Sequence, residues 1–149
     1  MVINSKNFFL IAFTVTLTDQ LIKLLVIAAK QQLPFEIIPK LLSISHSQNT
    51  GIAFGLLHGN NLLLGIVNLV VATLIIFHRK KLKEGVEAAA AAMVLGGALS
   101  NLADRVFRSY VFDYITVKGL PTFNLADAAL TIGATLIITA YLKERFRIN

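Results

Sequence analysis

Four long apolar stretches constrain the fold of this 149-residue chain more than any other feature. They run from about residue 8 to 29, 62 to 77, 86 to 103 and 123 to 142. A helix crosses a bilayer with about 20 apolar residues, so each stretch can span a membrane, the second and third near the lower limit. The first stretch follows a single basic residue and has no small-x-small cleavage site, so we interpret it as a retained span.

The composition excludes an ordinary soluble protein. Hydrophobic residues make up 56% of the chain and charged residues 15%, whereas a soluble domain has about 25% charged residues. The chain has no Cys, which excludes disulfides, Cys-ligated metals and cysteine nucleophiles. The net charge of +6 does not indicate nucleic acid here, because basic residues accumulate in the cytoplasmic loops of membrane proteins.

The distribution of basic residues predicts the orientation of the chain. With both termini in the cytoplasm, the cytoplasmic side has more Lys and Arg than the outer side, as the positive-inside rule requires. The inner set is Lys6, Arg79, Lys80, Lys81, Lys83, Lys143, Arg145 and Arg147, against Lys30, Lys40, Arg105, Arg108 and Lys118 outside.

The segments expected outside the membrane carry strand and turn signals. Leu42 to Ser45 alternates in the manner of a half-buried strand, and Asn49-Thr50-Gly51 supplies a turn. A second outer segment, from Arg105 to Pro121, joins the third and fourth spans. We therefore predict one all-α membrane domain over residues 1–149, with four transmembrane helices and a small β-rich element on the outer face.

The third stretch has a small residue at every fourth position. Ala88, Ala92, Gly96 and Ser100 form this ladder, which allows helices to approach closely in lipid. Ser100 is also a candidate nucleophile with Lys23 as its base, in the Ser–Lys manner, but we favour the packing role.

All four aspartates fall on or near the expected outer side. Ionisable residues in a span are expensive and are functional candidates. The tetrapeptide Asn101–Asp104 recurs as Asn124–Asp127, so on a helix each Asn can project beside its Asp and hold a carboxylate or a peptide group. Asp19 and Lys23 are one turn apart, and we favour a structural ion pair there. The remaining acid is Asp113.

Two further groups have modest interpretations. His46 and His58 could bind a metal together with an Asp, but we favour surface roles, and we expect neither a metal nor another cofactor. Tyr110, Phe112 and Tyr114 alternate and are expected at the level of the lipid headgroups.

Five segments together resemble the conserved boxes of the lipoprotein signal peptidases, the type II signal peptidases of bacteria. They occur in the family's order and extend from the first span to the fourth. Ser100 stands where the family usually has Gly. The segments are Asp19–Lys23, Asn49–Phe54, Gly96–Arg105, Val111–Ile115 and Phe123–Asp127.

The resemblance implies a four-helix aspartic endopeptidase of the bacterial cytoplasmic membrane, with an outward β-like cradle and no obligate protein partner. Its substrate would be a prolipoprotein with diacylglycerol on a Cys, in contact with membrane lipid and cleaved just before that Cys. The family's catalytic pair corresponds to Asp113 and Asp127, near the extracytoplasmic face. Its substrate-binding or supporting positions correspond to Asn49, Gly51, Asn101, Asp104, Arg105 and Asn124, with Asp19 and Lys23 more remote.

Two neighbouring carboxyl groups suit peptide hydrolysis. Because both resist being ionised when a few ångströms apart, they share one proton, and one serves as base while the other serves as acid. We expect Asp127 to be ionised, since it lies in the first turn of its helix, and Asp113 to keep the proton. The alternative is a small four-span ion or proton transporter with a carboxylate relay. That function favours acids spread through the bilayer, whereas here they cluster at one face.

Overall fold

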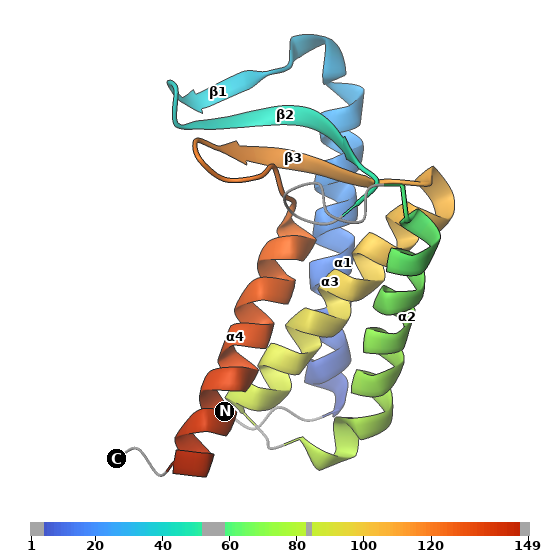
Figure 1. Ribbon diagram of the computed structural model, residues 1–149, viewed down its shortest axis with the longest axis vertical. Coiled ribbons are helices and arrows are strands. Elements are labelled where there is room, and N and C mark those ends of the chain that lie inside the picture. The colour runs from blue at the N-terminus through green and yellow to red at the C-terminus, as the bar shows by residue number, and fades with distance from the viewer. Residues whose placement is uncertain (1–4, 52–58, 83–84, 147–149) are drawn as a thin grey trace.

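The computed structural model describes residues 5–51, 59–82 and 85–146, and Figure 1 shows a helical bundle with a sheet at one end. Residues 52–54 of the second box, together with His58, Lys83 and Arg147, lie outside the described residues. Two short 3-10 turns occur at Lys30–Gln32 and Arg79–Lys81. The main elements are α1 (Ser5–Ala28), β1 (Phe35–Ile38), β2 (Leu42–Asn49), α2 (Asn61–His78), α3 (Val86–Arg108), β3 (Val111–Val117) and α4 (Leu125–Phe146).

Within the described residues, four helices are long and apolar enough to cross a membrane, which confirms the predicted fold class. The predicted bounds agree closely for α1 and α2, but α3 continues to Arg108 instead of ending near residue 103. Arg105 and Arg108 suit its last turn, because cations stabilise the carbonyl end of a helix. Ser109 then ends the helix in the left-handed conformation, with φ of 65°.

Helix α3 lies at the centre of the bundle and contacts the other three helices. Its span is 61% buried, against 17% for each of the others. A Cβ at Gly96 would lie 2.5 Å from the carbonyl oxygen of Ala12 in α1, and one at Gly97 would lie 2.5 Å from that of Ala126 in α4. Side chains are therefore excluded where α1 and α4 cross α3, which confirms the predicted packing role of the small residues.

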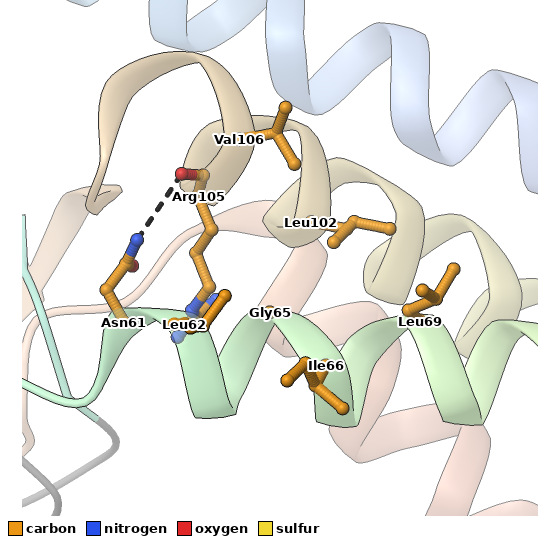
Figure 2. Close-up of a pocket in the computed structure, with 8 residues that line it drawn as sticks. All are labelled: Asn61, Leu62, Gly65, Ile66, Leu69, Leu102, Arg105 and Val106. Atoms are coloured by element: carbon orange, nitrogen blue, oxygen red, sulfur yellow. Dashed lines mark hydrogen bonds between the residues drawn. The ribbon is translucent and has the colours of Figure 1, made fainter.

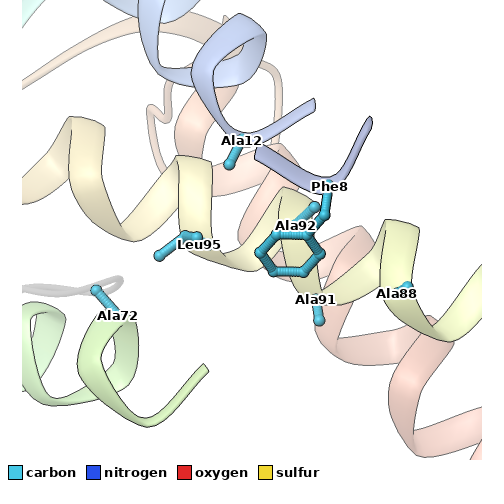
Figure 3. Close-up of a cluster of buried hydrophobic side chains, with 7 residues drawn as sticks. All are labelled: Phe8, Ala12, Ala72, Ala88, Ala91, Ala92 and Leu95. Atoms are coloured by element: carbon cyan, nitrogen blue, oxygen red, sulfur yellow. The ribbon is translucent and has the colours of Figure 1, made fainter. Parts of the chain in front are cut away.

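An apolar cluster fills the bundle at the end away from the sheet. Arg79 closes this end, with its guanidinium 5.7 Å from the ring centre of Phe8 and 5.0 Å from that of Phe9. Figure 3 shows the side chains gathered from α1, α2 and α3: Phe8, Ala12, Ala72, Ala88, Ala91, Ala92 and Leu95.

The sheet is antiparallel, with strand order β1-β2-β3. The predicted strand at residues 42–45 is the first half of β2, and β3 forms from the second outer segment. In the register, Asp113 lies opposite Ser47, and Asn49 lies opposite Val111. The start of α1 and the end of α4 lie at the opposite end of the molecule (Figure 1). We call the two ends of the bundle the sheet end and the terminal end.

The prediction that Tyr110, Phe112 and Tyr114 lie among lipid headgroups is wrong for Phe112 and Tyr114. Phe112 is fully buried and Tyr114 is 2% exposed, while Tyr110 is half-buried. Strand β3 contacts α1 and α3, so its inward side chains enter the protein interior.

Candidate active site

A cavity of about 620 Å³ lies near the sheet end of the bundle. Helices α2, α3 and α4 line it together with the chain at residues 49–51 and 120–123. Its apolar part is formed by side chains such as Leu64, Val67 and Leu130. Its polar part contains five of the site residues indicated by the sequence: Asn49, Gly51, Asn101, Arg105 and Asp127.

Asp127 is held by the start of its own helix. Its main-chain N–H donates to Asn124 Oδ1 at 2.8 Å, and the N–H of Asn124 donates to Asp127 Oδ2 at 3.2 Å. This reciprocal arrangement is a capping box, which fixes the carboxylate in the first turn of α4. The positive end of the helix dipole there favours the ionised form.

Asp113 lies beside the cavity in β3 and is 1% exposed. Asn49 Nδ2 donates to Asp113 Oδ2 at 2.9 Å, and Asn124 Nδ2 donates to Oδ1 at 2.7 Å. Burial, followed by the neighbouring charge of Asp127, raises the pKa of Asp113 to about 7 despite these bonds. At neutral pH this carboxyl group is therefore poised between its protonated and ionised forms.

Two asparagine side chains join the two acids. Asn101 Nδ2 donates to Asp127 Oδ1 at 2.7 Å, and Asn124 Nδ2 donates to Asn101 Oδ1 at 3.2 Å. Because Asn124 also donates to Asp113, the amides form a continuous connection, which we call the amide bridge.

One expectation for the repeated tetrapeptide is corrected by this arrangement. Asn124 does pair with Asp127, but Asn101 bonds to Asp127 of α4 instead of to Asp104 in its own tetrapeptide. Positions three apart on a helix differ by about 60° in direction. Asn101 therefore faces α4, while Asp104 faces α1.

Asp104 belongs to a fully buried cluster around Lys23. Lys23 Nζ lies 2.6 Å from Asp19 Oδ2 and 2.8 Å from Asp104 Oδ2. Asp104 also pairs with Arg108 and accepts a bond from the N–H of Phe112 at 3.0 Å. The predicted ion pair of Asp19 and Lys23 is thus confirmed, and it belongs to a network with two further charged residues, Asp104 and Arg108.

The Lys23 cluster contacts the amide bridge. Lys23 Nζ lies 3.5 Å from Asn101 Oδ1, the same oxygen that accepts from Asn124. A buried cation thus adjoins the amides that hold both candidate acids, and its charge favours their ionised forms.

The Ser–Lys alternative does not fit the hydrogen bonds of Ser100. Its hydroxyl is fully buried and donates to Asp19 Oδ2 at 2.6 Å. Gln20 Nε2 donates to the same hydroxyl at 2.9 Å.

His46 packs edge-on against Phe112, with ring centres 4.9 Å apart, and lies outside the Lys23 cluster.

Arg105 stands between the main cavity and a second one. Its Nη2 donates to the carbonyl oxygen of Gly51 at 3.2 Å. Figure 2 shows its side chain reaching from α3 toward α2, beside a cavity of about 300 Å³ that we call the α2–α3 groove. Asn61 Nδ2 donates to the carbonyl oxygen of Arg105 at 3.3 Å at one end of this groove. The groove is otherwise apolar: Leu62, Gly65, Ile66, Leu69, Leu102 and Val106.

Sequence reasoning did not place several residues in this site. The pair of Arg108 with Asp104 could have been predicted from their spacing of four residues, but only if the third helix continues beyond residue 103. Tyr114 had no sequence signal for its contacts: its hydroxyl donates to Asp19 at 3.1 Å and accepts from the N–H of Leu125 at 3.2 Å. Asn68 lines the cavity and was visible as an isolated amide in an apolar span.

Replacing Asp104 by Asn tests the structural weight of the Lys23 cluster. We expect Asp104→Asn to lower the free energy of unfolding by about 3 kcal/mol, because it breaks a buried ion pair. Unfolding in detergent micelles measures this effect. The control is Glu36→Gln, which removes a carboxylate from an exposed side chain of β1 and should leave stability unchanged. Equal stabilities of the two variants would contradict the role given to Asp104.

Comparisons with known proteins agree over nearly the whole chain. Residues 11–143 match the model of a family described as signal peptidase (SPase) II. The lipoprotein signal peptidase of Halothermothrix orenii is 37% identical over 143 residues, which cover 95% of this chain and 98% of the relative. That of Caldanaerobacter subterraneus subsp. tengcongensis is 38% identical over 138 residues, with 89% and 92% covered.

A solved structure extends the similarity to three dimensions. A bacterial membrane enzyme determined by the in meso method at 2.3 Å resolution superposes with a TM-score of 0.87. It is 32% identical and covers 97% of this chain and 93% of its own. With its four spans, the protein is a bacterial multi-pass membrane protein, and the transporter alternative finds no support. From its sequence and its fold alike, the chain belongs to the signal peptidase II family, the lipoprotein signal peptidases.

Proposed function

We propose that Asp113 and Asp127 are the catalytic pair with which this signal peptidase removes signal peptides from prolipoproteins. The observation that carries the assignment is the amide bridge, which holds both carboxyl groups beside one cavity. Asp104, the third candidate, is fully buried among Lys23, Arg108 and the N–H of Phe112. Its bonds support a structural role.

The two environments suit opposite tasks in peptide hydrolysis. Asp127, ionised at the start of α4, accepts a proton from a water molecule as the water oxygen bonds to the scissile carbonyl carbon. Asp113, whose pKa is raised to about 7, donates its proton to the carbonyl oxygen. When the tetrahedral intermediate collapses, the C–N bond breaks and the leaving amine takes the proton that Asp127 received. One hydroxyl of the intermediate returns its proton to Asp113, which restores the pair.

The substrate is a prolipoprotein that carries a diacylglyceryl group on the Cys after the scissile bond. The signal peptide occupies the main cavity, with its apolar part against side chains such as Leu64 and Leu130. The acyl chains occupy the α2–α3 groove, where exposed Leu62 and Val106 meet lipid. Arg105 lines both cavities and so lies at the junction of peptide and lipid.

The cytoplasmic side is the terminal end of the bundle. The basic residues at 79–81, 143 and 145 support this orientation. The sheet and the catalytic pair then lie at the extracytoplasmic face, where a translocated precursor presents its cleavage site.

Asn at either catalytic position keeps the shape of the side chain but cannot exchange the proton. We expect Asp113→Asn and Asp127→Asn each to lower kcat for a diacylglyceryl precursor at least a thousandfold, with precursor binding retained. Because the two acids act as one unit, the double variant should be no slower than either single variant. Cleavage and binding of the same precursor measure both effects.

Asp104→Asn is the matched control for this test, since it removes a third acid of the same region. We expect it to retain measurable cleavage once it is folded. Cleavage by Asp113→Asn near the parent rate would contradict the assignment, and Asp104 with Asp127 would then be the pair to test.

The raised pKa of Asp113 predicts a stability cost at alkaline pH. An unfolded Asp has a pKa near 4, so between about pH 4 and 7 the folded protein binds more protons at this site than the unfolded chain. Its contribution to stability is therefore lost as pH rises through about 7. Asp113→Asn removes this dependence. The difference in free energy of unfolding between the variant and the parent should therefore shift in favour of the variant by on the order of 3 kcal/mol from pH 5 to pH 8. Unfolding of both proteins at the two pH values measures this shift, and a difference that does not change with pH would contradict the explanation.

Filling the α2–α3 groove tests its role as the acyl-chain site. Ile66 lines the groove and is 49% exposed, whereas Ile76 lies outside it on the same helix and is 50% exposed. We expect Ile66→Trp to raise KM for the diacylglyceryl precursor about tenfold, and Ile76→Trp to leave KM unchanged. Equal KM values for the two variants would place the acyl chains elsewhere.

Thiol labelling tests the orientation, because the chain has no Cys of its own. His46→Cys and Lys118→Cys lie at the exposed sheet end, and Lys81→Cys at the exposed terminal end. An impermeant maleimide added to intact cells should label positions 46 and 118 but not 81. Labelling at position 81 alone would invert the proposed orientation.

A further inference from the structure

Asn68 is an amide inside the membrane whose hydrogen bonds are incomplete. It lies within α2, where Thr73 and His78 bond to carbonyl oxygens of their own helix and Asn61 donates to the carbonyl oxygen of Arg105 in α3. The Nδ2 atom of Asn68 is buried and has no hydrogen-bond partner among the described residues. A buried donor without a partner costs free energy, most of all in a membrane, where water does not compensate.

The surroundings of Asn68 indicate where a partner would come from. Asn68 lines the main cavity with Leu64 and Val67 of α2 and Leu130 of α4, whose side chains offer no acceptor. Thr131 also lines the cavity, but its hydroxyl donates to the carbonyl oxygen of Asp127 at 2.8 Å. Because no described residue bonds to Asn68 Nδ2, a ligand that occupies the cavity can supply its acceptor.

Asn68 lies about one helical turn further from the sheet end than the catalytic pair. The bond from Asn61 to the carbonyl oxygen of Arg105 places these two residues at one level. Asn68 is two turns further along α2, a rise of about 10 Å, and Asn101 is one turn back along α3, a rise of about 6 Å. Asn101 bonds to Asp127, so Asn68 is deeper than the dyad by roughly 5 Å.

The apolar segment of a signal peptide supplies suitable acceptors at this depth. In lipid such a segment is helical, and the last four carbonyl groups of a helix lack partners within it. The chain must leave the helix before the scissile bond, so that water and two carboxyl groups can reach its carbonyl group. The unpaired carbonyls then fall just before that bond, and a depth of about 5 Å corresponds to one to three residues.

We propose that Asn68 Nδ2 donates a hydrogen bond to a main-chain carbonyl oxygen of the signal peptide, one to three residues before the cleaved bond. Asn68 is then a positioning residue that caps the end of the signal-peptide helix and sets where the chain becomes extended. The inference rests on the proposed function, because it requires a signal peptide in the main cavity.

Binding measurements test this inference without relying on turnover. In the inactive Asp127→Asn background, Asn68→Leu should weaken binding of the diacylglyceryl precursor about tenfold, the value of one buried hydrogen bond. In the active enzyme the same change should raise KM about tenfold and leave kcat unchanged. Thr73→Val is the control, since it removes a polar group from α2 that bonds within its own helix. Unchanged binding and KM in Asn68→Leu would overturn the proposal.

Two further readouts separate positioning from a structural role. Without substrate, Asn68→Leu should be as stable as the parent or more stable, because it removes an unpaired buried amide. A precursor whose amide is replaced by an ester at the contacted carbonyl should bind the parent more weakly but bind Asn68→Leu no differently. Loss of stability with a matching fall in kcat, or equal ester effects in both proteins, would contradict the proposal.

Failure of the proposed function would look different. Cleavage by Asp127→Asn at the parent rate would contradict the catalytic assignment, but the affinities of the proteins with and without Asn68→Leu for the precursor could still be compared. If Asn68→Leu binds the precursor as tightly as the parent while Asp127→Asn is inactive, only the role of Asn68 is contradicted.

Discussion

The buried ammonium of Lys23 is the interaction on which the rest of this site depends. It pairs with both Asp19 and Asp104, and Arg108 adds a second positive charge beside Asp104. Each acid also binds a main-chain group: Asp19 accepts from the N–H of Ala126, and Asp104 from the N–H of Phe112. One charge in α1 thereby fixes α3, the start of β3 and the start of α4. In a membrane interior these carboxylates would be prohibitive without it, since an unpaired buried charge costs several kcal/mol.

The same framework gives two chemically similar acids different properties. The carboxyl group of Asp113 comes from a buried strand and that of Asp127 from a helix start, and the amide bridge joins them. Burial and the neighbouring charge hold the proton on Asp113, while the helix dipole favours charge on Asp127. We infer that the proposed acid–base pair is asymmetric because its two carboxyl groups come from different backbone elements, and that the amide bridge holds the two groups in a fixed relative position.

The sequence predicted the elements that follow local rules. Apolar length indicated four spans, and the small residues indicated close packing at Gly96. The end of α3 was predicted too early, although the pair of Asp104 and Arg108 there is local to the helix. The burial of Tyr114 was not predictable, because it depends on a tertiary contact with Asp19. For the site, the resemblance to the family selected Asp113 and Asp127, whereas residue spacing alone left Asp104 as a third candidate. The bond from Asn101 to Asp127 required the packing of α3 against α4, which no local pattern encodes.

Infrared spectroscopy of the carboxyl groups tests the central claim that Asp113 carries the shared proton. Difference spectra of the substrate-free protein between pH 5 and pH 9 report the C=O stretch of a protonated acid. We predict one buried-acid band that disappears with a midpoint near pH 7 and is absent in Asp113→Asn. A band that persists unchanged in Asp113→Asn and is lost in Asp127→Asn would place the proton on the other acid and contradict the account.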